Sequence, residues 1–173
     1  MPSQFDQVLK ERRSVRKFKP DEVSSHDLRE LAALGVWAPS AGNAQTWSFV
    51  IVRDSSKLEA IHAVSPGMLA PPPAVIVVCQ DEQRAREVGG RLGVERCAVM
   101  DSAMAAQNIM LAAHARDLAT CPVLSFHSPA VGQILNLPEN VVPHLLIEIG
   151  YAETTPAAPK RSVEGVIRFD RYE

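Results

Sequence analysis

The chain has 173 residues, of which 46% are hydrophobic and 22% charged, and its formal net charge is −2. These values are typical of a globular domain and exclude a disordered chain, a collagen-like chain and a disulfide miniprotein. Nucleic-acid binders normally carry an excess of basic residues, whereas here 20 Asp and Glu outnumber 18 Lys and Arg. We therefore expect one domain over residues 1–173 that binds no nucleic acid.

Cysteine usage and apolar run lengths indicate the compartment. The three cysteines, Cys79, Cys97 and Cys121, are odd in number and form no CxxC motif, so neither a disulfide framework nor a zinc site is expected. The five histidines do not stand at metal-ligand spacing, and we predict no metal. No apolar run has the length of a signal peptide or a membrane span. We expect a cytoplasmic protein that does not associate with membranes.

Helix and strand patterns alternate along the chain, which indicates an α/β or α+β domain. Pro39 ends one helix, because proline cannot continue it. A strand without polar positions, such as the run at 74–79, is typical of one covered on both faces. The predicted elements are a short helix around 5–9, a helix over 25–37, a strand over 48–53, a short helix from 55 or 56, a strand over 74–79, a helix over 97–116, a short helix over 128–135 and a strand over 144–149.

Three further segments shape the expected assembly. The helix over 97–116 is apolar nearly all round, which predicts burial at the centre of the domain or at a dimer interface. The polar segment over 81–96 contains three glycines and is expected to be an exposed, partly helical excursion. The segment over 151–173 has no periodicity and is predicted to be an extended arm, with Val166–Phe169 as a possible edge strand.

A basic cluster directly follows the first helix. Arg12–Lys17 places four cations and one hydroxyl within six residues. Arginine donates bidentate, charge-assisted hydrogen bonds to phosphate oxygens, and serine adds a neutral donor. The cluster therefore fits a phosphate clamp, although a solvated helix end with cations near the negative end of the dipole would look the same.

A second cluster, Ala38–Trp47, links a helix to a strand and combines small residues with two amides. Asn43 and Gln45 each offer hydrogen-bond donors and an acceptor, which suits a planar ring with N–H, C=O and N groups on its edge. The same residues also fit a plain helix-to-strand turn with Asn43 in a left-handed conformation.

Together the two clusters resemble the nitroreductase family of flavin mononucleotide (FMN) enzymes. The resemblance is carried by Arg12–Phe18 and Pro39–Trp47 at the family's usual separation. Asp101–Ala113 is similar to the family's central helix, and Leu137–Glu139 precedes a strand that ends at Gly150. The resemblance implies a three-layer α+β sandwich with a mostly antiparallel sheet. It also implies an intertwined homodimer in which each FMN site draws on both chains.

The resemblance assigns cofactor-binding roles by motif position. The first motif would meet the phosphate, the ribityl chain and the pyrimidine edge, the second motif would line the ring, and a basic residue of the arm would return to the phosphate. Arg161 is the best candidate for that return, with Lys160 second. The implied cofactor-binding residues are Arg12, Arg13, Ser14, Arg16, Pro39, Ser40, Ala41, Asn43, Gln45 and Arg161.

The implied activity is ping-pong hydride transfer from NADH or NADPH, through FMN, to a small-molecule acceptor such as a nitroaromatic or a quinone. Flavin supplies the chemistry, so no catalytic nucleophile or base is named. A positive group near the pyrimidine edge would stabilise the reduced flavin, and we expect Arg16 to provide it. Alternatives are a flavin-dependent dehydrogenase in cofactor or peptide maturation, a non-catalytic flavin-binding protein, and a basic module that binds a polyanion.

Two departures from the family pattern are expected to matter. After the central helix the family has a Gly-Leu-Gly turn, where this chain reads Arg116–Cys121 (RDLATC). Glycine tolerates backbone angles that Asp and Ala resist, so we expect a different turn and altered flavin contacts nearby. The segment over 81–96 is short for the family, and a more open pocket is expected.

Overall fold

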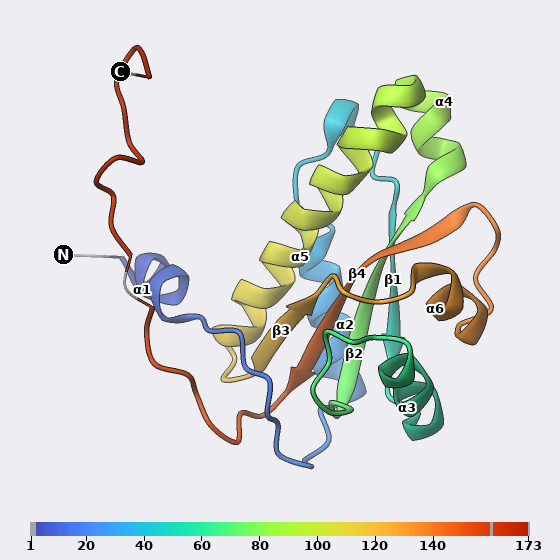
Figure 1. Ribbon diagram of the computed structural model, residues 1–173, viewed down its shortest axis with the longest axis vertical. Helices are drawn as coiled ribbons and strands as arrows, with labels where there is room; N and C mark the ends of the chain where they lie inside the picture. Colours follow the sequence, from blue (N-terminus) through green and yellow to red (C-terminus); the bar gives the residue numbers. More distant parts are fainter. Residues whose placement is uncertain (1–2, 160, 173) are drawn as a thin grey trace.

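One antiparallel sheet organises the fold (Figure 1). The computed structural model describes residues 3–159 and 161–172. Every strand pair is antiparallel, and the strand order is β1-β2-β4-β3. The strands are β1 (Trp47–Val52), β2 (Ala74–Asp81), β3 (Ala119–Val123) and β4 (Val141–Gly150).

Helices cover both faces of this sheet, and β2 shows how its sequence accomplishes this. Successive strand residues point to opposite faces. Ile76 and Val78 pack with α2 (Ser25–Gly35) and α5 (Ala98–His114). Val75 and Val77 pack with α3 (Ser55–Ala63) and α6 (Ser128–Ile134) on the other face. The three-layer α+β sandwich and the doubly covered strand are therefore confirmed.

The remaining helices stand outside the three layers. Helix α1 (Gln4–Glu11) is closed by a capping box between Ser3 and Asp6 and lies to one side of the sandwich (Figure 1). The predicted excursion after β2 is mostly helical. It begins with α4 (Glu82–Leu92), which is kinked at Gly90. A π-helical turn, η2 (Gly93–Cys97), follows and continues into α5. Gly93 is required there, because a Cβ would collide with the carbonyl oxygen of Ala85.

Helix α5 is less enclosed than its sequence predicts. Ala105, Ile109 and Ala113 are fully buried against the sheet. On its outer side Val99 is 52% and Met100 64% exposed. Small and apolar residues thus lie on both sides of α5, but the single chain covers only one of them.

Three sequence predictions differ from the structure. Strand β3 was not predicted, and β4 begins at Val141 rather than at residue 144. The predicted edge strand Val166–Phe169 is wrong: this stretch forms a turn and irregular backbone in an extended, exposed arm. The arm leads away from the sandwich beyond α1 (Figure 1). Over the described ranges no helix is both long and apolar enough to cross a lipid bilayer.

Candidate functional site

The basic cluster is held against the start of β3. Ser14 forms a parallel bridge with Thr120, and the N–H of Val15 donates to the Thr120 carbonyl at 2.9 Å. Val15 is 3% exposed and anchors the segment. In extended backbone neighbouring side chains point to opposite sides, so the side chains of Ser14 and Arg16 point away from the core that receives Val15. Arg16 is exposed.

One nitrogen of the Arg12 guanidinium, the Nη1 atom, is buried without a hydrogen-bond partner among the described residues. Desolvation lowers the pKa of Arg12, and the nearby positive charges of Arg13 and Arg161 lower it further. A guanidinium with one nitrogen buried and unpaired, close to like charges, is stabilised when an anion binds it. Arg161 lies close enough to Arg12 for its charge to lower the pKa of Arg12. Lys160, the second candidate, lies outside the described residues.

Arg13 has a different contact from the one expected. Its Nη1 donates to the carbonyl of Lys10 at 2.6 Å and to the carbonyl of Arg12 at 2.9 Å. These are carbonyls at the end of α1, which cationic side chains commonly satisfy. In this conformation Arg13 closes the helix, and its remaining nitrogens stay available to a ligand.

The second cluster forms a tight turn with an unusual backbone. Gly42, Asn43 and Gln45 have φ values of 57°, 54° and 48°. The Gln45 N–H donates to Ser40 Oγ at 3.1 Å, and Gln45 Nε2 donates to Asn43 Oδ1 at 2.7 Å. Asn43 thus adopts the left-handed conformation that a plain helix-to-strand turn would also require. Of the remaining predicted residues, Pro39 and Ala41 are exposed.

The two clusters lie at opposite ends of α5. The Ala41 N–H donates to Asp101 in the first turn of α5. Arg12 instead lines a cavity of about 190 Å³ together with His114, the last residue of α5. His114 lies thirteen residues after Asp101 in the helix, which is roughly 20 Å at 1.5 Å per residue. One chain therefore does not bring the two predicted motifs together.

The turn after α5 keeps a glycine-like conformation in spite of its sequence. Asp117 has a φ of 59°, and the Leu118 N–H donates to the Ala113 carbonyl at 2.9 Å, closing the helix. Aspartate enters the left-handed region more readily than most residues other than glycine. The expectation that Asp would resist such angles is therefore wrong at this position.

Sequence reasoning missed an acidic residue next to the basic cluster. Glu148 is 1% exposed on β4 and pairs across the sheet with Cys121 on β3. Burial raises the pKa of Glu148 to about 7, against the opposing influence of the Cys121 hydrogen bond and the Arg16 charge. Burial also raises the pKa of the Cys121 thiol to about 11, and the charge of Glu148 is the second cause of this rise. The sequence offered one signal for this residue: Glu148 is the only acidic residue in the otherwise apolar run 144–149.

A buried polar network was missed as well. Gln80, fully buried on β2, accepts a hydrogen bond from the Thr46 hydroxyl. Its Nε2 donates to Ser102 Oγ at 2.7 Å and to the Ala98 carbonyl at 2.9 Å. The network ties the end of the second cluster to α5, so a shift of that loop would break buried hydrogen bonds. The only hint in the sequence was a glutamine at the end of an apolar strand.

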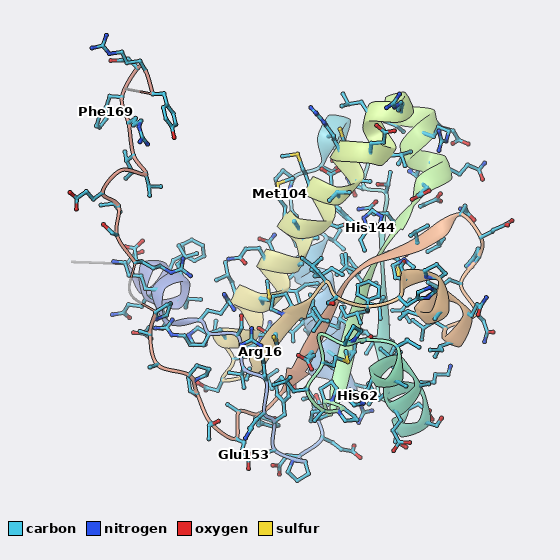
Figure 2. All side chains as sticks on the ribbon, viewed as in Figure 1. Arg16, His62, Met104, His144, Glu153 and Phe169 are labelled. Carbon is cyan, nitrogen blue, oxygen red and sulfur yellow. The ribbon has the colours of Figure 1, made fainter. Side chains whose placement is uncertain are left out.

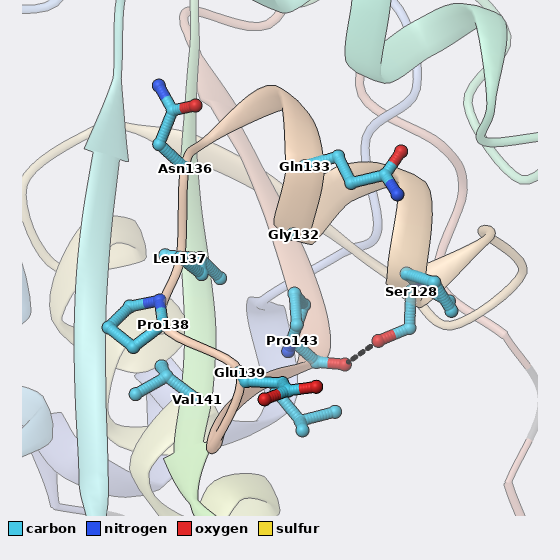
Figure 3. A pocket seen from close by; sticks show the side chains of 11 residues that line it. Ser128, Gly132, Gln133, Asn136, Leu137, Pro138, Glu139, Val141 and Pro143 are labelled. Carbon is cyan, nitrogen blue, oxygen red and sulfur yellow. Dashed lines mark hydrogen bonds between the residues drawn. The ribbon is translucent and has the colours of Figure 1, made fainter.

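Another cavity, of about 660 Å³, lies between α6 and the start of β4 (Figure 3). Gln133, Asn136 and Glu139 contribute its polar groups. Its described lining includes no residue of either predicted cluster, so this cavity is separate from the candidate site.

Comparisons with known proteins agree with this geometry. The Nitroreductase family model matches residues 9–67 and 61–151. The chain is 30% identical over 156 residues to the "Putative NADH dehydrogenase/NAD(P)H nitroreductase" of Methanothermobacter thermautotrophicus, which covers 87% of this chain and 78% of that protein.

Two crystal structures show the same fold. A protein of the same name from Bacteroides thetaiotaomicron has a TM-score of 0.87 at 28% identity, over 99% of this chain and 100% of that one. Nitroreductase A of Vibrio parahaemolyticus, at 22% identity, also has a TM-score of 0.87, over 100% of this chain and 78% of that one.

The three-layer α+β fold and the match to the family model define the class of this protein as an oxidoreductase. The chain belongs to the nitroreductase family, and it is an NAD(P)H-dependent oxidoreductase of that family.

Proposed function

We propose that the protein binds FMN and uses NADH or NADPH to reduce nitroaromatics, quinones or similar acceptors. The observation that carries this proposal is the buried, unpartnered Nη1 of Arg12, with Arg161 nearby. When bound, FMN supplies the ring that accepts and then passes on a hydride, in ping-pong order. The chain's own residues bind and orient the cofactor.

Arg12 and Arg161 would hold the phosphate, with the Ser14 hydroxyl as a neutral donor. A phosphate dianion would partner the buried Nη1 of Arg12 and offset the repulsion between the two arginines. The cluster fits one terminal phosphate, and the sequence has no dinucleotide fingerprint for a second nucleotide. We therefore propose FMN rather than FAD.

The loop Pro39–Gln45 would line the ring from a second copy of the chain. Its separation of roughly 20 Å from Arg12 along α5 is too large for one chain to surround one compact ligand with both motifs. The exposed apolar residues on the outer side of α5 offer a surface for that second copy. We accordingly propose a homodimer with two shared sites.

Arg16 would place its charge near the pyrimidine edge of the ring. It is exposed, unlike Arg12, and it extends from the segment that Val15 anchors. A positive charge at that edge stabilises the negative charge that develops when the ring is reduced. Glu148 lies near enough to Arg16 to be affected by its charge, so the two groups would be electrostatically coupled.

Release of the cofactor by heat and its chromatographic identification test the proposal. We expect FMN, and recovery of FAD alone would contradict it. Arg12→Ala should weaken FMN binding by roughly 2–5 kcal/mol, because it removes one partner of a desolvated charge pair. The matched control is Arg29→Ala, which removes an exposed arginine of α2. Equal FMN affinity in both variants would show that Arg12 does not bind the phosphate.

A further inference from the structure

Glu148 is a buried carboxyl group to which the proposed function gives no task. It lies in the apolar strand β4, opposite Cys121 of β3 and Val75 of β2. Residues paired across an antiparallel sheet share a face, and Val75 belongs to the apolar core under α3 and α6. Glu148 is 1% exposed, and its Oε2 atom has no hydrogen-bond partner among the described residues. The ionised form of this carboxyl group is therefore poorly stabilised by its immediate surroundings.

Apolar side chains cover the end of β4 next to Glu148. Gly150 follows two residues later and lies on the same face of the strand. A Cβ atom on Gly150 would meet the side chains of Phe18 and Pro73. The segment 64–73, which connects α3 to β2, contains no titratable side chain. On this side the surroundings of Glu148 therefore offer neither a counter-charge nor a second acid.

The groups that titrate or carry charge near Glu148 lie toward β3. Cys121 hydrogen-bonds to Glu148 and keeps its own proton, because burial raises the pKa of this thiol to about 11. Arg16 lies beside the start of β3 (Figure 2). Its charge lowers the pKa of both Glu148 and Cys121, whereas Arg12 acts on Cys121. Arg16 is therefore the group that links Glu148 electrostatically to the proposed flavin site.

We propose that Glu148 is a redox-linked proton site, which binds a proton from solvent when the flavin ring is reduced and releases it when the ring is reoxidised. The inference rests on the proposed function, because it requires FMN with its pyrimidine edge at Arg16. Hydride transfer adds two electrons and one proton to the ring and leaves one negative charge on it. That charge offsets the positive charge of Arg16, so the field that favours the ionised form of Glu148 weakens. The carboxylate then takes up one proton as its O–H, and it forms no bond to the ring.

The sheet geometry gives the size of this coupling. The segment that carries Arg16 pairs with β3, and β3 pairs with β4, so the two backbones lie two strand spacings, or roughly 10 Å, apart. Unit charges roughly 12–15 Å apart, at an effective dielectric constant of about 20, change each other's proton affinity about five- to tenfold. Burial raises the pKa of Glu148 to about 7. A change of this size therefore alters the protonation of Glu148 near neutral pH.

Spectroelectrochemical titration of the FMN-loaded protein from about pH 6 to about pH 9 counts the protons that are taken up with two electrons. At about pH 7.5 the unaltered protein should take up about 0.4–0.5 of a proton more than Glu148→Gln, as expected for a five- to tenfold change in proton affinity. Protonation of the ring itself is common to both proteins, so the difference isolates Glu148. Glu59→Gln, which alters an exposed carboxyl group of α3, should behave like the unaltered protein.

Infrared difference spectra between the oxidised and the reduced FMN-loaded protein identify the proton site directly. Reduction should add the carbonyl-stretching band of a protonated carboxyl group, and Glu148→Gln should lack this band. Labelling of glutamate carboxyl groups with ¹³C should shift the band in the unaltered protein, which keeps the test decisive even if Glu148→Gln does not fold. A protein that takes up no FMN would refute the proposed function and this inference with it. A protein that binds and reduces FMN, but shows no such band and the same proton uptake as Glu148→Gln, would leave the proposed function intact and overturn the role of Glu148.

Discussion

The backbone N–H of Ala41 donates to both carboxylate oxygens of Asp101, at 3.2 Å to each. Asp101 is 3% exposed, and burial raises its pKa while this hydrogen bond opposes the rise. The contact connects the first turn of α5 to the loop that we expect to line the flavin ring. A buried carboxylate so close to the loop therefore acts as its positioning group.

Asp101→Ala should lower the free energy of unfolding by about 1.5–3 kcal/mol, the range for a hydrogen bond to a charged group. It should also weaken FMN binding, because the loop Ser40–Gln45 loses its attachment. Asp101→Asn keeps an acceptor for the Ala41 N–H and should recover most of both quantities. Urea unfolding and flavin titration measure them. Equal defects in the two variants would mean that packing, not this hydrogen bond, holds the loop.

Glu148 predicts a pH dependence of stability. Its pKa of about 7 in the folded protein lies above its usual value, so the folded state keeps a proton that the unfolded state loses. The free energy of unfolding should therefore fall as pH rises from about 4.5 to about 7, by at most about 3 kcal/mol, and level off above. Glu148→Gln should flatten this part of the curve and stabilise the protein at pH 8.

Urea unfolding at pH 5 and pH 8, at one protein concentration, measures this effect. Glu153→Gln in the exposed arm is the matched control and should retain the slope of the unaltered protein. The interpretation fails if Glu148→Gln has the same pH dependence as the control variant.

Arg16→Ala should act on the redox potential of bound FMN more than on its retention. With a positive charge removed from the pyrimidine edge, the midpoint potential should shift downward and hydride transfer from NAD(P)H should slow. Spectroelectrochemical titration measures the potential, and Lys17→Ala is the exposed neighbouring control. If Arg16→Ala leaves the potential unchanged while Arg12→Ala lowers it, the two roles are exchanged.

The outer side of α5 predicts the oligomeric state. Light scattering should give about twice the 18.8 kDa chain mass. Met100→Glu places a charge on the proposed interface and should shift the protein toward monomers that lose FMN, because a charge desolvated there has no partner. Arg86→Glu on the exposed face of α4 makes a comparable change elsewhere. A flavin-loaded monomer at micromolar concentration would contradict the proposed dimer.

The three layers were expected from the family resemblance, and local patterns supplied their elements. The apolar run Ala74–Cys79 is typical of a strand covered on both faces, and caps and prolines indicated where helices begin and end. Strand β3 was missed because Ala119–Val123 is short and contains Pro122, which is rare in central strands. Its strand conformation comes from pairing with β4, a long-range contact that no local pattern carries.

The sequence supplied residue types for the candidate site but not their positions in space. Motif spacing pointed to Arg12 and the loop around Asn43, but it could not show that α5 separates them within one chain. Glu148 was missed for a physical reason. It is a polar residue in an otherwise apolar strand, and only the strand register decides whether such a side chain meets a charge or the core.

The two edges of the sheet differ in a way that bears on how the protein can associate. On β3, Thr120 is already bonded to Val15, and Pro122 has no N–H to donate. On β1, no described strand pairs with the outer edge. A sheet with a single available edge can join one other strand or sheet and then has nothing left to extend, whereas a fibril needs two. Edge-to-edge pairing through this sheet therefore has the outer edge of β1 to use, whereas Pro122 and the bond to Val15 reduce what the edge of β3 offers to a further strand.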